Sequence, residues 1–254
     1  MRTYTHCNSK KTMMRKVLEL TGSDATPFLQ SLVTNDINKR GLVYTALLTP
    51  QGKFMLDFFV LNHDDALWID VAADHAAGLA QRLTMYRLRA DVMIAELDIT
   101  VSRGTGDAPI GAYPDPRSPA MGWRDYGEAQ DMPTDWDALR VAQMVPQLDA
   151  ELGPDSYILE MGFERLNGVD FKKGCYVGQE IVARMKHKTE LRKGLARVSS
   201  SEPLSEGAEI TSNGKPVGTV HTVSGTSALA YLRFDRANEM ISDGINVTLE
   251  ERSV

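Results

Sequence analysis

Cysteine is scarce in this sequence: Cys7 and Cys175 are the only two among 254 residues. Two thiols do not make a disulfide framework, and this count is typical of a reducing, cytosol-like compartment. No apolar run approaches the roughly 20 residues that a membrane-spanning helix needs. The five histidines are scattered and show no zinc-ligand spacing with the cysteines, and neither a GxGxxG nor a P-loop pattern is present. The sequence therefore predicts a cytoplasmic protein with no membrane span, zinc motif or nucleotide-binding motif.

Acidic residues are absent from the first eighteen positions, which do contain basic and hydroxyl side chains. Such a stretch is typical of an organellar transit peptide. A plain extension, or a start codon assigned ahead of Met13 or Met14, explains it equally well. We therefore set residues 1–14 apart as a flexible or spurious N-terminal extension. A secretory signal is disfavoured, because no apolar core follows the basic residues.

The formal net charge of −6 argues against a protein coated in basic surface for duplex DNA. Positive charge is nevertheless concentrated between Lys172 and Lys193, where seven lysines and arginines accompany only Glu180 and Glu190. A solvated helix face or strand edge accounts for such a run. An attractor for an anionic ligand or partner accounts for it as well.

Apolar patterning predicts a mixed α+β architecture. Capping residues and 3.6-residue periodicity predict helices at 24–33, 74–88 and 136–144 and from 178 onward. Apolar β-type runs predict strands at 17–20, 43–48, 54–60, 67–71 and 92–101. Asp57 lies inside one of these apolar strands, so its carboxylate must reach solvent or a partner. The Gly-, Pro-, Asp- and Ser-rich segment 104–122 predicts a long loop.

The pattern changes after about residue 190. Short β-type segments alternate with turns at Asn213-Gly214, Ser224-Gly225 and Asp243-Gly244. Short strands at this spacing predict a small barrel or sandwich. We therefore expect two domains, the first over residues 15–189 and the second over residues 190–254.

Cys175 is the side chain that the sequence most clearly marks as reactive. It precedes a helix expected to start at Gly178, where free N–H groups and the positive end of the helix dipole favour an anion. Lys172 and Lys173 add positive charge, so we expect the pKa of the thiol to be lowered and its thiolate fraction raised. A lone cysteine is also compatible with a small, buried, unreactive residue.

Other uses of this cysteine are less favoured. A resident iron–sulfur cluster usually takes four thiolates, so one chain with this sequence cannot hold a cluster alone. A cysteine hydrolase needs a histidine beside Cys175, and nothing in the spacing selects His187 or His221.

Residues 173–180 read KGCYVGQE and resemble the signature K-G-C-Y-x-G-Q-E of the YgfZ family, relatives of the glycine-cleavage T-protein. The resemblance continues in FLQ at 28–30, VTND at 33–36, LLTPQGK at 47–53 with Asp57, YRLR at 86–89 and GTV at 218–220. It covers the chain from about residue 15 to the C-terminus.

The resemblance implies a T-protein-like fold around a tetrahydrofolate pocket, with a small C-terminal β-barrel. It implies a folate-dependent accessory factor for assembly or repair of iron–sulfur clusters in client enzymes, including tRNA-modifying enzymes. Cys175 then acts as a transient cluster ligand or redox-active thiol. The implied partners are reduced folate and iron–sulfur client or carrier proteins. Neither DNA nor a membrane is expected as a partner, and a transient dimer is left as an open alternative. The cofactor-binding residues expected from motif position are Asn35, Asp57, Tyr86, Arg89, Lys173, Gln179, Glu180 and Arg184.

Two departures from the T-protein pattern bear on the alternatives. Gly78 stands where T-proteins carry the Asp that activates aminomethyl transfer, and Ala142 stands where a folate-contacting Glu is expected. The first departure argues against a tetrahydrofolate-dependent aminomethyl or one-carbon transferase, which remains the alternative enzyme function. The second weakens the expected pterin-binding geometry. A third hypothesis is a folate sensor or scaffold whose thiol is inert.

Overall fold

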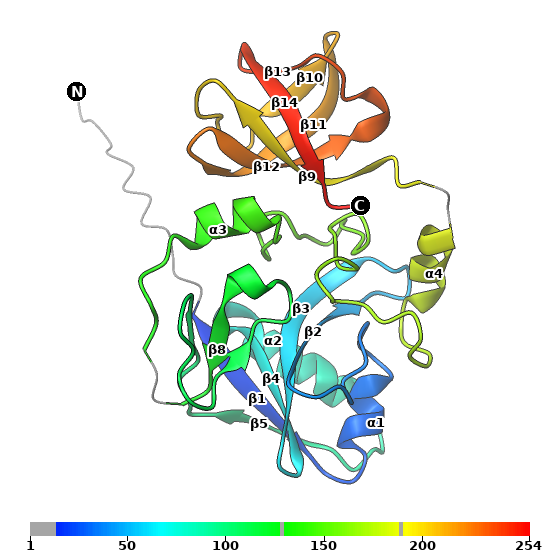
Figure 1. The fold of residues 1–254 in the computed structure, drawn as a ribbon. Helices are drawn as coiled ribbons and strands as arrows, with labels where there is room; N and C mark the ends of the chain where they lie inside the picture. Colours follow the sequence, from blue (N-terminus) through cyan, green and yellow to red (C-terminus); the bar gives the residue numbers. More distant parts are fainter. Residues whose placement is uncertain (1–13, 128–129, 188–189) are drawn as a thin grey trace, which may run out of the picture.

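The computed structural model describes residues 14–127, 130–187 and 190–254. A lower body carries a five-stranded sheet, and a closed β-barrel lies above it, with helix α3 (Trp136–Gln143) and the C-terminus at the junction (Figure 1). The N-terminal extension expected over residues 1–14, except for Met14, lies outside the described residues, as does Cys7. No helix in the described ranges is long and apolar enough to cross a membrane.

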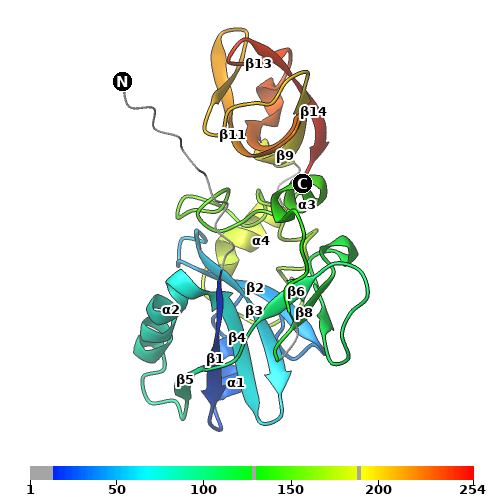
Figure 2. The ribbon, with the colours of Figure 1, turned by 90° about the vertical axis from the view of Figure 1, so that its left-hand side faces the viewer.

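An antiparallel sheet in the order β2-β3-β4-β1-β5 forms the centre of the lower body. Its strands are β1 (Arg15–Thr21), β2 (Leu42–Leu48), β3 (Phe54–His63), β4 (Ala66–Ala72) and β5 (Met93–Leu97). Every residue of β2 is buried, so both faces of that strand are covered. The helices are α1 (Ala25–Gln30) and α2 (Ala73–Tyr86). Seen edge-on, α2 lies against one side of the sheet, while β6 and β8 lie on the other (Figure 2).

The second covering layer is a three-stranded sheet in the order β6-β8-β7. It is formed by β6 (Ser102–Gly104), β7 (Tyr113–Pro114) and β8 (Trp123–Asp125), with a 3-10 helix, η1 (Pro119–Met121), before β8. The prediction of an element-free loop over 104–122 is therefore wrong. Strands of two or three residues are too short to show a periodicity of their own and are defined by their pairing.

Helix α1 ends at Gln30, earlier than the apolar stripe through Val33 predicts. The reason is tertiary: Val33 forms an antiparallel bridge with Leu47, and the buried Thr34 donates its hydroxyl to the carbonyl of Gly168. The chain therefore leaves helical geometry to join the edge of β2.

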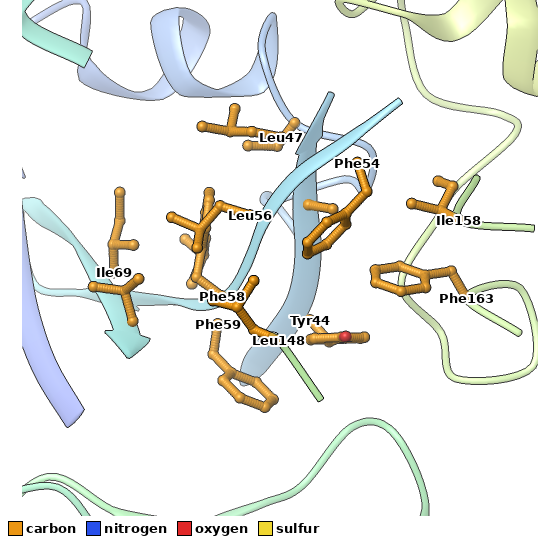
Figure 3. Close-up of a cluster of buried hydrophobic side chains, with 14 of the residues drawn as sticks. Tyr44, Leu47, Phe54, Leu56, Phe58, Phe59, Ile69, Leu148, Ile158 and Phe163 are labelled. Carbon is orange, nitrogen blue, oxygen red and sulfur yellow. The ribbon is translucent and has the colours of Figure 1, made fainter. Parts of the chain in front are cut away.

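Aromatic side chains fill the core between β2, β3 and the segment after α3 (Figure 3). The rings of Tyr44 and Phe163 stack at 5.1 Å, and Phe54 meets Phe163 edge-on at 6.2 Å. Because side chains alternate along a strand, Asp57 and Phe59 lie on the face of β3 opposite Phe58. This alternation points the one acidic residue of the strand toward the three-stranded sheet.

The C-terminal strands form a closed barrel in the order β10-β11-β12-β9-β14-β13. They are β9 (Lys193–Ser200), β10 (Glu209–Ser212), β11 (Lys215–Ser224), β12 (Ser227–Arg233), β13 (Met240–Ser242) and β14 (Ile245–Arg252), with η2 (Phe234–Arg236) after β12. The barrel has its own apolar core, separate from that of the lower body. The α+β class with a C-terminal barrel is thus confirmed, whereas the three-residue β13 was not predicted.

A buried polar cluster joins the barrel to α3. Arg140 Nη2 donates to Thr222 Oγ1 at 2.7 Å, and its Nη1 donates to Glu151 Oε2 at 2.8 Å. At the end of the helix, Arg197 Nη1 donates to the carbonyl of Ala142 at 2.7 Å. These contacts hold α3 between the two bodies.

Candidate functional site

Cys175 is an exposed free thiol between two buried anchors. Lys173 is 9% exposed, and its Nζ donates to the carbonyls of Gln30, Val33 and Asn35. Tyr176, on the other side of the cysteine, is 7% exposed. The chain on both sides of Cys175 is therefore held by the core of the lower body, while the sulfur faces solvent.

Glycine packing joins the cysteine motif to the β2–β3 hairpin. Gly178 has φ +83°, and a Cβ there would lie 2.7 Å from the carbonyl oxygen of Thr49. Gly52 has φ +72°, and a Cβ there would lie 2.6 Å from Ile181 Cβ. Ile181 belongs to α4 (Gln179–His187), the helix that follows the motif. The TPQGK and KGCYVGQE motifs thus form one packed unit that positions the thiol.

We expect Gly178→Ala to destabilise the protein and loosen the Cys175 loop. Alanine at positive φ costs about 1–2 kcal/mol, and the close approach to Thr49 adds an overpacking cost of about 1–3 kcal/mol. Gly174→Ala is the matched control, because a Cβ at Gly174 meets no atom within 4 Å. Urea unfolding should show a loss for Gly178→Ala and almost none for Gly174→Ala. Equal stabilities of the two variants would contradict the proposed packing.

The expected basic run around Cys175 is largely paired in the structure. Lys186 contacts Glu164, and Arg184 Nη2 lies 3.2 Å from Glu180 Oε1, four positions earlier on the same helix. Burial lowers the pKa of Lys173 to about 8, against the attraction of nearby carboxylates. Lys173 therefore acts as a structural anchor.

A second feature is a small cavity between the two sheets of the lower body, with a volume of about 30 Å³. Five arginines and one acid line it: Arg15 of β1, Asp57 of β3, Arg103 of β6, Arg117 before η1, Arg124 of β8 and Arg140 of α3. The charged groups thus come from six separate segments of the chain.

Two buried carboxylates pair with three of these arginines. Asp115 accepts from Arg117 Nε at 2.9 Å and from Arg117 Nη2 at 2.7 Å, and from Arg124 Nε at 3.3 Å. Asp70 accepts from Arg15 Nε at 2.5 Å and from Arg124 Nη1 at 3.1 Å. Burial acts to raise the pKa of Asp115, but the charges and hydrogen bonds of Arg117 and Arg124 prevail and hold it at about 2.

Asp57 lies in the same cavity and accepts a 2.9 Å hydrogen bond from the hydroxyl of Tyr44. Burial raises the pKa of Asp57, although Tyr44, Arg15 and Arg117 favour its ionised form. The pKa of the Tyr44 hydroxyl is raised as well, by burial and by the charge of Asp57. In this pair the Tyr44 hydroxyl therefore donates to the Asp57 carboxylate, and burial disfavours the ionised form of that carboxylate.

Of the eight residues expected to bind cofactor, only Asp57 lines the arginine cavity. Asn35 is buried and donates to the carbonyls of Tyr44 and Asn167. Tyr86 and Arg89 are exposed at the end of α2 and just after it. Arg184 lines a separate cleft of about 940 Å³ between α4 and β12. The structure therefore does not bring these residues together with Cys175 in one pocket.

Gln179 and Glu180 begin α4 outside the cavity, and Glu180 is exposed. Gly78 lies on α2 and lines a different small pocket, beside Asp74 and His75. Ala142 is exposed on α3 and does not line the arginine cavity. Neither departure from the T-protein pattern therefore concerns a residue of this cavity.

Sequence reasoning missed all five arginines of the cavity: Arg15, Arg103, Arg117, Arg124 and Arg140. Three of them belong to or flank the short strands that the composition of 104–122 concealed. The available signal was the presence of Asp107, Asp115 and Arg117 inside segment 104–122, with Arg103 and Arg124 directly beside it.

A tetrahydrofolate ring does not fit this cavity. Small-molecule pockets usually measure about 300–1,000 Å³, far more than the 30 Å³ found here. Guanidinium groups only donate hydrogen bonds, and Asp57 is the only carboxylate among the described residues that line it. The amino and ring N–H groups of a pterin need several acceptors. Within the described ranges, no group of three or more His, Cys, Asp or Glu residues could hold a metal ion.

Comparison with known proteins gives both a sequence and a fold likeness. Residues 192–253 match the family described as "CAF17, C-terminal beta-barrel domain". The chain is 30% identical to "Iron-sulfur cluster assembly factor IBA57 homolog, mitochondrial" of Neurospora crassa, over 72% of this chain and 51% of that protein. It is 29% identical to "Iron-sulfur cluster assembly factor IBA57, mitochondrial" of Homo sapiens, over 86% of this chain and 75% of that protein. The chain spans about half the length of the fungal relatives that it matches first.

A solved structure supports the fold. Aminomethyltransferase T of the glycine cleavage system from Bartonella henselae superposes with a TM-score of 0.69, covering 93% of this chain and 83% of that one, at 12% identity. The predicted T-protein-like fold is confirmed. This likeness concerns the fold alone.

The prediction of a cytoplasmic location is contradicted. The relatives that it resembles are named as mitochondrial proteins. Low cysteine content does not separate the cytosol from other reducing compartments, which is why the sequence argument failed. In sequence the chain is similar to IBA57-type iron–sulfur cluster assembly factors, and its fold is that of aminomethyltransferase T.

Proposed function

We propose that this protein is an accessory factor for iron–sulfur cluster assembly or repair, of the YgfZ type, and that it acts through Cys175. Sequence similarity to proteins named as iron–sulfur cluster assembly factors supports the proposal. The KGCYVGQE motif, which contains Cys175, supports the assignment of the thiol. The cluster is the cargo of this activity and not a resident cofactor.

The observation that carries the proposal is the exposure of Cys175 on a loop with two buried anchors. A thiolate is both a nucleophile and a metal ligand, and it must reach its target from the surface. Because the flanking chain is fixed by Lys173 and Tyr176, a partner protein meets the sulfur at a defined place. A buried thiol could not perform this role.

One thiolate supplies one ligand of a cluster that usually has four. The remaining ligands must therefore come from a carrier protein, a client enzyme or a second copy of this chain. Exposed basic side chains beside the loop, such as Lys172, favour acidic surfaces on such a partner. Client enzymes that modify tRNA belong to this proposal as one class of recipient.

Folate takes no step in this proposal, because the arginine cavity does not fit a pterin ring. The alternative one-carbon transferase function is disfavoured by Gly78, which stands where T-proteins carry the activating Asp. Turnover of an aminomethyl donor by the purified protein with tetrahydrofolate would restore that alternative.

The proposal is tested by mixing the purified protein with a cluster-loaded carrier protein and an apo client enzyme under anaerobic conditions. We expect the client to recover activity faster when this protein is present, with cluster absorbance moving from carrier to client. In cells, loss of the protein should lower the activity of iron–sulfur enzymes while their polypeptide levels stay constant. Unchanged client activity in both experiments would refute the proposal.

A further inference from the structure

Arginines dominate the charged lining of the cavity: among the described residues, five guanidinium groups and one carboxylate line it. The guanidinium groups of Arg15, Arg117 and Arg124 share the carboxylates of Asp70 and Asp115. Arg103 adds a fourth guanidinium to the same cavity. Asp57 is the remaining acid, and burial opposes its ionisation. Among the described residues, these four arginines therefore face Asp57, Asp70 and Asp115, with Asp131 as a further acid beside Arg103.

Arg103 differs from the other arginines of this cavity in its contacts. Its guanidinium lies 3.9 Å from the ring centroid of Trp136 and forms no ion pair with any residue in the described ranges. The carboxylate of Asp131 accepts a hydrogen bond from the backbone N–H of Arg103, and its negative charge acts to raise the pKa of that guanidinium. Burial, together with the charges of Arg124, Arg117 and Arg15, lowers the pKa of Arg103 to about 9. A half-buried cation among other cations is costly unless a counter-charge is supplied.

Arg140, which also lines the cavity, has an unsatisfied hydrogen-bond donor. It is 4% exposed, and its Nη1 and Nη2 groups have acceptors on Glu151, Val145, Asp137 and Thr222. Its Nε–H has no hydrogen-bond partner among the described residues. Buried donors in native proteins nearly always have an acceptor, so this one indicates a ligand or an ordered water.

We propose that the cavity binds a small oxyanion, namely a carboxylate or phosphate group, that pairs with Arg103 and accepts a hydrogen bond from Arg140 Nε. One such group supplies a negative charge beside Arg103 and an acceptor oxygen for Arg140 Nε. Arginine is the side chain best suited to bind these anions, because its forked donors match two oxygens at once.

The size of the cavity restricts the ligand to a head group or a small free ion. One water needs about 10–15 Å³ of such space, so 30 Å³ accommodates a few heavy atoms and no ring system. The proposed anion would contact β6 through Arg103 and α3 through Arg140. Since Arg140 also bonds Thr222 of the barrel, the anion would stabilise the junction of the two bodies. This inference does not depend on the role proposed for Cys175.

The test is thermal unfolding of the full chain in potassium phosphate, potassium acetate or potassium chloride at equal ionic strength. An anion that binds only the folded protein raises Tm by mass action. At a concentration one hundred times Kd, the expected rise for a chain of this size is roughly 5–10 °C. A rise with phosphate alone identifies a phosphate site, and a rise with acetate alone identifies a carboxylate site.

Arg103→Met should remove the anion-dependent rise while keeping or raising Tm in chloride, because it deletes a half-buried charge that lies among other cations. Arg236→Met is the control, since Arg236 is exposed on the barrel and should leave the rise intact. Calorimetric titration of inorganic phosphate and acetate into the unmodified protein is a second measurement that needs no variant.

Two outcomes would overturn the proposal. One is the absence of both a Tm rise and binding heat with phosphate and acetate. The other is an equal anion response in the unmodified protein and in Arg103→Met. Stabilisation by 6-methyltetrahydropterin, which has no anionic group, without any response to phosphate or acetate would identify a ring site and also overturn it.

Discussion

Cys175→Ser is expected to abolish the cellular function while leaving the fold intact. Serine retains the size of the side chain but cannot form a thiolate, and the thiolate is the species that ligates iron or exchanges disulfides. Because Cys175 is exposed and its side chain contributes nothing to the core, its replacement should change stability by less than about 0.5 kcal/mol. Iron–sulfur enzyme activity in cells carrying the variant should equal that in cells lacking the protein.

The matched control is Cys7→Ser, which removes the other thiol of the chain. This variant should support normal enzyme activity if the function depends on Cys175 alone. Circular dichroism and urea unfolding of both variants separate loss of chemistry from loss of structure. Full activity with Cys175→Ser would remove the thiol from the mechanism, while the similarity to assembly factors would remain.

The rate of Cys175 alkylation against pH separates a functional thiol from an inert one. The sequence resemblance implied both a tetrahydrofolate pocket and a functional Cys175. The structure places it on a surface loop, and the arginine cavity lies elsewhere in the lower body. Accessibility of the sulfur therefore no longer depends on any pocket, which makes the thiol proposal independent of folate.

Local sequence patterns predicted much of the fold. The β2–β3 hairpin was predictable because its turn contains both Pro50 and Gly52 between two apolar runs. The start of α4 was predictable from the change of periodicity at Gly178. Both glycines have positive φ, as the turn at one and the helix entry at the other require. Such features depend on neighbours in sequence, and so a single sequence is sufficient to find them.

The arginine cavity could not be predicted in this way. Arg15 and Arg140 are 125 positions apart, and only the stacking of the two sheets with α3 brings their side chains to one cavity.

Lys173 shows the converse error. In the sequence it belongs to a basic run and was expected to bind cofactor, whereas its ammonium is buried on three carbonyls at the end of α1. Burial of a charge is a property of the tertiary structure.

Asp115→Asn is expected to be among the most destabilising single substitutions in the lower body. Asp115 is 5% exposed and accepts hydrogen bonds from Arg117 and Arg124, both of them buried. The amide would remove the negative charge and leave Arg117 facing an uncharged group in a cavity already rich in cations. Breaking a buried ion pair by removing one partner costs about 3–5 kcal/mol, measurable by urea unfolding at neutral pH.

Glu180→Gln is the matched control for this substitution. It also converts a carboxylate that pairs with an arginine into an amide, but both partners, Glu180 and Arg184, are exposed. Exposed pairs contribute less than about 1 kcal/mol. A similar loss for the two variants would show that burial of the Asp115 network has no energetic consequence.

The pH dependence of the Asp115→Asn effect follows from the sign of the pKa shift. The pKa of Asp115 is about 2 in the folded protein, below its usual value in an unfolded chain, which is about 3.9. A lowered folded-state pKa gives stability that is fully present above pH 4 and is lost as the pH falls toward 2. The difference in unfolding free energy between the unmodified protein and Asp115→Asn should therefore be constant from pH 7 to pH 4. It should shrink by about 2 kcal/mol between pH 4 and pH 2, because protonated Asp115 resembles the amide. A difference that stays constant down to pH 2 would mean that the carboxylate is not held ionised by Arg117 and Arg124.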